Sequence, residues 1–195
     1  VMTIRLPETS DRWAAGDRAG YLAVVRGGIR PIVFLLVPAA AGYVLLASPI
    51  VRLLLEHGAL SSSSASTTAE VLAAFSVGLP AFGVYLFLMN GYQAMQNTRA
   101  MFAVYCVENG LNVLLALVLH PILGVRGLGF ALALAYMGGT VIAARDVGRR
   151  AGGPVELVPA LGATLRPLVV MAVPVAVGSW ALRGASGVLL GVGRV

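Results

Sequence analysis

Residues 32–55 read IVFLLVPAAAGYVLLASPIVRLLL, an apolar run whose one charged residue is Arg52. A helix needs about 20 mostly apolar residues to cross the hydrocarbon core of a bilayer, so this stretch predicts a membrane span. Four further runs have the same character: residues 71–89, 101–119, 128–144 and 168–182. The sequence therefore predicts an all-α fold, a polytopic transmembrane helix bundle with about five spans.

The composition supports a membrane protein and argues against several other classes. The chain is 58% hydrophobic and only 11% charged, whereas soluble domains have about half apolar and a quarter charged residues. Its net charge of +6 does not indicate nucleic-acid binding, because the arginines lie at the ends of apolar runs rather than on one polar face. Cys106 is the single cysteine and lies inside an apolar run, so we expect no disulfide, no metal site and no cofactor.

Polar stretches divide the chain into four parts. Residues 1–30 are expected to form a cytoplasmic, interfacial amphipathic segment with arginines near the headgroups; the alternative is a solvated linker helix. Residues 31–145 would hold four transmembrane helices, and residues 146–166, which contain Gly152-Gly153-Pro154, a cytoplasmic linker. Residues 167–195 would add one more transmembrane helix and end within a new apolar run. The ends of the chain indicate a piece of a longer protein of the plasma (inner) membrane.

The arginines predict the orientation of these spans. Cytoplasmic loops carry an excess of Lys and Arg. With five crossings, one side receives Arg5, Arg12, Arg18, Arg26, Arg30, Arg99, Arg145, Arg149, Arg150 and Arg166, and the other receives Arg52, Arg126, Arg183 and Arg194. The side with more arginines is expected to be cytoplasmic. Arg26, Arg30 and Arg99 are candidates for contacts with headgroups or for a cytoplasmic gate.

Prolines and small residues within the spans predict how the helices bend and pack. Pro38, Pro80 and Pro174 lie inside apolar runs, where proline bends a helix. The fourth run carries small residues at every fourth position, which lets a neighbouring helix approach closely: Gly127, Ala131, Ala135, Gly139 and Ala143.

Polar residues inside the spans are the candidates for function. Glu108 is the foremost, because an ionisable side chain in a span costs about 2.5–3.5 kcal/mol on insertion scales and marks a bundle interior or a wet cavity. It shares one helical face with Tyr105, Asn109 and Asn112. Glu108 is either a proton, cation or substrate-path residue or a neutral carboxyl that is hydrogen-bonded to neighbouring amides.

The second run carries a similar polar stripe, in which Ser76, Gly83, Asn90 and Asn97 are spaced seven residues apart. Asn90, Asn109 and Asn112 either join helices by hydrogen bonds or line a substrate path. The sequence contains no nucleophile and base arrangement and no nucleotide-binding fingerprint, so an enzyme is not expected.

Several motifs in collinear order resemble the MurJ (MviN) family of lipid II flippases, within the superfamily of multidrug, oligosaccharidyl-lipid and polysaccharide exporters. They are TIRLPETS (3–10), VPAAAG (37–42), SPIVRLLLEHGAL (48–60), FSVGLP (75–80), GYQAMQNTR (91–99), Asn112 and GLGFA (127–131). The resemblance covers about residues 1–150. The chain departs from the family pattern at Asn97, where the family has Asp, and at Ala100-Met101, where it has Thr-Pro. Glu108 lies where the family is apolar or neutral, so no family role applies to it.

The resemblance implies the C-terminal half of a two-lobe, fourteen-helix flippase that works by alternating access in peptidoglycan synthesis. Its partners would be lipid II or a related polyprenyl-pyrophosphate glycolipid, membrane lipids and a missing N-terminal lobe that holds the substrate-gripping arginines. Two alternatives stay open: a sister exporter of another polyprenyl-linked oligosaccharide or of drugs, and a non-transporting membrane scaffold for cell-wall enzymes.

Overall fold

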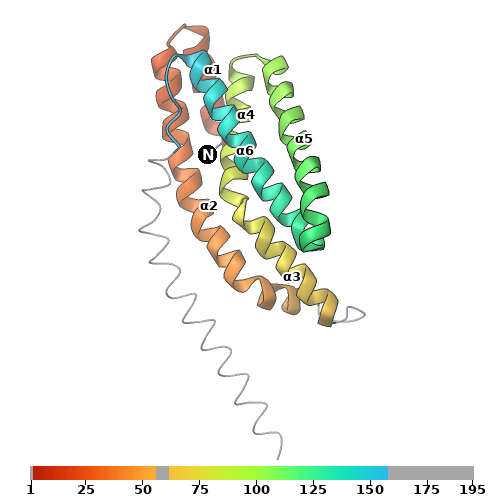
Figure 1. Ribbon diagram of the computed structural model, residues 1–195. Coiled ribbons are helices and arrows are strands. Elements are labelled where there is room, and N and C mark those ends of the chain that lie inside the picture. Colours follow the sequence, from red (N-terminus) through yellow and green to blue (C-terminus); the bar gives the residue numbers. More distant parts are fainter. Residues whose placement is uncertain (1, 56–61, 158–195) are drawn as a thin grey trace, which may run out of the picture.

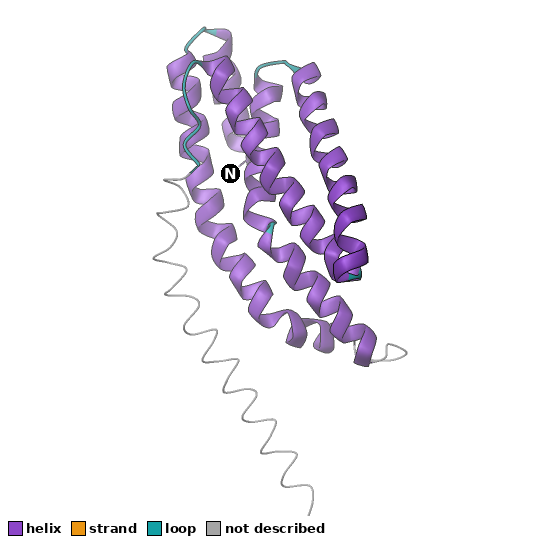
Figure 2. Ribbon diagram, in the orientation of Figure 1, coloured by secondary structure: helices purple, strands orange, loops and turns teal. Residues whose placement is uncertain are grey.

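The computed structural model describes residues 2–55 and 62–157, which form helices joined by short turns, with no strand in these ranges (Figures 1 and 2). The fifth predicted span, with Pro174, lies outside the described residues. The helices are α1 (Met2–Ala14), α2 (Arg18–Leu55), α3 (Ser62–Val77), α4 (Leu79–Ala94), α5 (Thr98–Leu123) and α6 (Val125–Ala151).

The described helices form a multi-pass membrane bundle, which confirms the predicted fold class. Three helices, α2, α5 and α6, are each long and apolar enough to cross a bilayer. A fourth crossing is formed if α3 and α4, which meet at an angle of 49°, are taken as one broken span. In Figure 1, α2 and α5 descend from the end of the bundle that carries α1, while α4 and α6 return to it.

Helix α6 lies at the centre of the bundle and packs against α3, α4 and α5. Half of the residues in the most apolar 18-residue stretch of α6 are buried, whereas only 11% are buried in the corresponding stretch of α5. The small residues explain this difference, since all five positions of the predicted ladder are buried. At Gly127 an added Cβ would lie 2.5 Å from the Leu119 carbonyl oxygen. The predicted close approach along this face is confirmed.

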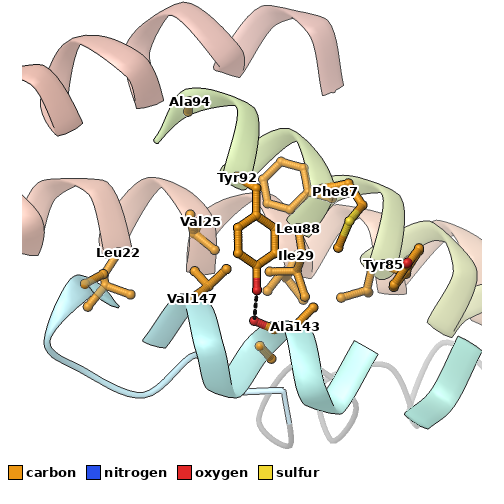
Figure 3. Packing of buried hydrophobic residues seen from close by; sticks show 14 of the residues in the cluster. Leu22, Val25, Ile29, Tyr85, Phe87, Leu88, Tyr92, Ala94, Ala143 and Val147 are labelled. Carbon is orange, nitrogen blue, oxygen red and sulfur yellow. Dashed lines mark hydrogen bonds between the residues drawn. The ribbon is translucent and has the colours of Figure 1, made fainter. Parts of the chain in front are cut away.

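The main hydrophobic core joins α2, α4 and α6 near the end of the bundle where α2 begins (Figure 3). Its fully buried large side chains include Tyr21 and Ile29 from α2, Leu88 and Tyr92 from α4, and Val147 from α6. Tyr21 donates a hydrogen bond from Oη to the Gly91 carbonyl oxygen at 3.1 Å. The tyrosines therefore supply both apolar bulk and polar ties between helices, as polar groups in lipid require.

The predicted boundary at residue 30 does not correspond to a break in the helix. Helix α2 runs without interruption from Arg18, and Tyr21, Val25 and Ile29, four residues apart, face the core. The turn comes earlier, at Gly16, whose φ of 75° favours glycine. The apolar stripe continues past the arginines that suggested a polar, interfacial segment, so residues 18–30 belong to the same continuous helix as the apolar run.

Two further expectations differ from the structure. The polar stripe of the second run is interrupted, because Ser76 lies on α3 and Asn90 on α4, on the two sides of the bend at Gly78. Pro80, which was predicted to bend the span, is the second residue of α4 and directly follows this bend of 49°; at that position its missing N–H breaks no helical bond. The expected linker begins late, since α6 continues to Ala151 and ends at Gly152 in the left-handed conformation.

The turn between α1 and α2 gives a prediction for pH dependence. Asp17 Oδ1 accepts a hydrogen bond from the Gly20 N–H at 2.8 Å, and Oδ2 accepts one from Arg12 at 2.9 Å. Both bonds lower the pKa of Asp17, and the bond from Gly20 has the larger effect. Since the folded pKa is below the unfolded one, the stabilisation is present above about pH 3.9 and is lost as the pH falls through the folded pKa.

We therefore expect Asp17→Ala to reduce the thermal stability of the intact protein at pH 7 and to have a smaller effect as the pH falls below about 4. Melting temperatures of wild type and variant between pH 3 and 7 test this. Asp11→Ala, at an exposed position on α1, is the control. A gap between wild type and Asp17→Ala that stays constant down to pH 3 would contradict the assignment.

Candidate functional site

Glu108 is buried in the bundle although it lies within a membrane span. Its side chain is 3% exposed, on the inner face of α5. Oε2 accepts a hydrogen bond from Asn109 Nδ2 at 3.0 Å, while Oε1 has no partner among the described residues. Asn109 Nδ2 also donates to the Tyr105 carbonyl oxygen at 2.9 Å. The carboxyl group is therefore only partly satisfied, which is costly in a span.

Aromatic side chains from two other helices surround this carboxyl. The Tyr85 ring of α4 lies 5.7 Å from the Tyr105 ring and 5.5 Å from the Tyr136 ring of α6. Tyr85 Oη is also buried without a partner among the described groups. Gly139 of α6 leaves the room for the carboxyl, since a Cβ there would lie 2.9 Å from Glu108 Cγ. Glu108 Oε1 and Tyr85 Oη can therefore each make a further hydrogen bond.

The sequence indicated Glu108 and Asn109, with Tyr105 on the same helical face, but it did not indicate Tyr85 or Tyr136. Tyr85 and Tyr136 lie on separate helices and reach Glu108 only through the packing of α4, α5 and α6. A tyrosine within an apolar run is a weak signal, because its ring fits a core equally well. The remaining amide candidates are not joined to this group by a hydrogen bond: Asn112 is half-buried one turn further along α5, and Asn90 is half-buried on α4.

A second polar cluster joins α4 to α6 at the end of the bundle where α2 begins. Tyr92 Oη donates to Asp146 Oδ2 at 2.8 Å. It also approaches the Ala143 carbonyl oxygen at 3.4 Å (Figure 3). Arg150 Nε donates to the same carboxylate oxygen at 2.7 Å. One part of this cluster is visible in the sequence, since Asp146 and Arg150 are four residues apart, the spacing of an ion pair on one helix. The predicted linker boundary at 146 had placed them outside the helix.

The hydroxyl of Tyr92 supplies the interhelical part of this cluster, so Tyr92→Phe is expected to lower the free energy of unfolding by about 0.6–1.7 kcal/mol. The phenyl ring keeps its packing, and only the contacts of the hydroxyl with Asp146 and with the Ala143 carbonyl oxygen are lost. Titration of the intact protein with a denaturing detergent measures the change. Tyr43→Phe, at an exposed position on α2, is the matched control. Equal stability of the two variants would show that the hydroxyl contributes nothing.

The structure places the remaining candidates in separate surroundings. Ser76 is buried and donates to the Leu72 carbonyl oxygen of its own helix at 2.6 Å, so it does not point into a path. Arg26 donates from Nε and Nη2 to the Pro154 carbonyl oxygen, at 3.1 and 2.6 Å, and ties α2 to the segment after α6. Arg30 and Arg99 are exposed. Pro38 lies within α2 and does not interrupt it.

Two contacts that the sequence did not indicate hold the bend and the following turn. Thr140 of α6 donates from Oγ1 to the Ala81 carbonyl oxygen of α4 at 2.9 Å, next to the bend. Asn97 accepts a hydrogen bond from the Ala100 N–H at 3.0 Å and caps α5. The amide thus performs the capping that an aspartate would provide, so the departure from the family pattern at this position leaves the turn intact.

Comparison with protein families identifies one that matches nearly the whole chain. The family model described as lipid II flippase MurJ matches residues 1–192. Among curated proteins, a lipid II flippase MurJ of Thermosipho africanus is 27% identical over 135 residues, which are 69% of this chain and 27% of that protein. A probable lipid II flippase MurJ of Rhizobium meliloti is 33% identical over 131 residues, 67% of this chain and 24% of its own length.

A solved structure has the same fold. It is described as lipid II flippase MurJ in an inward closed conformation. The match has a TM-score of 0.70 and 22% sequence identity, and it covers 95% of this chain and 36% of the chain in the solved structure. The chain thus spans about a quarter of the length of the curated relatives and about a third of the solved structure.

Proposed function

The chain belongs to the lipid II flippase MurJ family, and from this premise we propose that it forms part of a flippase for lipid II. The intact protein would move this polyprenyl-pyrophosphate-linked peptidoglycan precursor from the cytoplasmic to the outer leaflet of the plasma (inner) membrane. The observation that carries the proposal is the match of the family model over residues 1–192. The multi-pass bundle fits transport across a membrane.

Within this proposal, α2 to α6 form one wall of the transport path, and an N-terminal lobe of the same protein holds the substrate's pyrophosphate. Alternating access would move the two lobes against each other, as it does in transporters built from repeats. Glu108 is the candidate polar contact on this wall, since its Oε1 has no partner among the described residues. The bend between α3 and α4 is a candidate position for movement.

Depletion of the intact protein in its own host, followed by measurement of lipid II in each leaflet, tests the proposal. We expect lipid II to accumulate in the inner leaflet and to disappear from the outer one, and wild-type protein to restore it. Persistent outer-leaflet lipid II would overturn the proposal. Accumulation of another glycolipid would identify a sister exporter, and displaced cell-wall enzymes with normal lipid II would identify a scaffold.

A further inference from the structure

Four arginines line a hollow of about 570 Å³ where α2 begins and α6 ends. They are Arg18 and Arg26 of α2 and Arg149 and Arg150 of α6. Ala19, Leu22 and residues 151–153 complete the lining, and no carboxylate belongs to it among the described residues. Four positive charges that converge on one hollow repel each other, and an anion between them would offset that repulsion.

Three of these arginines have contacts that hold them in place. Arg18 lies over the Trp13 ring at 3.3 Å, and Arg26 donates to the Pro154 carbonyl oxygen. Arg150 donates to the Asp146 carboxylate at 2.7 Å. Arg149 is exposed and lines this hollow together with the next one along α6. A guanidinium of this kind can bind two phosphate oxygens at once.

A second hollow, of about 410 Å³, shares Arg149 and Arg150 with the first and runs between α5 and α6. Except for Arg145, Asp146, Arg149 and Arg150 at one end, its lining is apolar: Ala100, Ala103, Val104, Val107 and Ile142. Asp146 is occupied by Tyr92 and Arg150. A cationic hollow thus continues into an apolar groove between α5 and α6, which fits a ligand with a phosphate and a hydrocarbon chain.

We propose that this pair of hollows binds a resident anionic phospholipid, with the phosphate among the arginines and one acyl chain between α5 and α6. Basic pockets between transmembrane helices on the cytoplasmic side are typical sites for anionic headgroups. The arginine-rich end is the cytoplasmic one by the positive-inside rule. A free phosphate shares the headgroup chemistry, but it would leave the apolar groove without a role. The bound lipid is separate from the transported one.

Arg149→Gln in the intact protein tests the site. The variant and wild type are purified in detergent, and bound phosphatidylglycerol and phosphatidylcholine with the same acyl chains are measured by native mass spectrometry. We expect Arg149→Gln to weaken phosphatidylglycerol binding about fivefold, as loss of about 1 kcal/mol per arginine near a lipid surface implies. Phosphatidylcholine has the same phosphate but no net charge, so it should bind wild type more weakly and change less in the variant. Melting temperatures in lipid-free detergent verify that the variant is folded.

Arg52→Gln is the matched control, because Arg52 is an exposed arginine in the last turn of α2 at the opposite end of the bundle, as Arg149 is in the last turn of α6. Equal weakening by both variants, or no weakening by Arg149→Gln, would overturn the proposal. Inorganic phosphate is added in a further arm. If it displaces phosphatidylglycerol at equal concentration, the hollow binds a free anion and the lipid assignment is wrong.

Discussion

Gly78→Leu is expected to lower the free energy of unfolding of the intact protein by about 3 kcal/mol or more. Gly78 lies between α3 and α4, at the bend of 49°, and faces the backbone of α6. A Cβ added there would lie 2.6 Å from Ala133 Cα and 2.8 Å from Ala133 Cβ. Backbone atoms cannot rotate away from such a contact, so α6 has to move, and with it the centre of the bundle.

Titration with a denaturing detergent measures this loss, and Gly110→Leu is the control. Gly110 lies on the exposed side of α5, where an added Cβ meets nothing within 4 Å. Replacing a helical glycine there removes unfolded-state entropy, so the control is expected to be neutral or slightly stabilised. Gly78→Ala should fall between the two. If Gly78→Leu were as stable as Gly110→Leu, close packing of the bend on α6 would not be needed for the fold.

The sequence predicted the described spans because the pattern that decides them is local. An apolar run of about 20 residues crosses a bilayer whatever its neighbours are. The same holds for the ladder of small residues on α6, where a four-residue spacing indicates a packing face without saying which helix packs on it. These parts of the fold depend on one helix at a time.

The boundaries were less predictable, since charged residues at a helix end have two possible meanings. Arg18, Arg26 and Arg30 suggested that residues 1–30 were separate from the span, yet α2 contains all three. Long arginine side chains can reach headgroups or a polar hollow while their helix continues into lipid. Arg26 uses that reach to bind the Pro154 carbonyl oxygen, a partner 128 residues away.

The partners of the polar candidates could not be predicted, because they come from other helices. Tyr85 and Tyr136 surround Glu108 only when α4, α5 and α6 assemble. Likewise Tyr92 and Asp146 are 54 residues apart in the chain. For Ser76 the sequence predicted a relation that the structure does not have. Its spacing placed it in one polar stripe with Asn90, but the bend at Gly78 puts the two residues on different helices. Interhelical contacts of this kind follow from the packing, which no single run encodes.

Glu108→Gln is expected to reduce transport of lipid II by more than about tenfold while making the protein harder to unfold. Under the proposed function, the carboxylate supplies a charged contact on the transport path, and such contacts contribute about 1.5–3 kcal/mol. In the protein without substrate, the same carboxylate lowers the free energy of unfolding. A buried acceptor without a partner costs about 1–3 kcal/mol, and more when it is charged. Glutamine keeps the size of the side chain and removes the charge, so both effects should appear in one variant.

Outer-leaflet lipid II in cells that depend on the variant, together with detergent titration of the purified protein, measures the two effects. Glu70→Gln is the control, since Glu70 pairs with Arg126 at 2.6 Å in a partly exposed ion pair on α3 and α6, and such pairs contribute about 0–1 kcal/mol. A gain in stability with unchanged transport at every pH would make Glu108 a structural residue only. A loss of both would mean that the carboxyl stabilises the bundle, so that its burial among the tyrosines serves packing rather than the path.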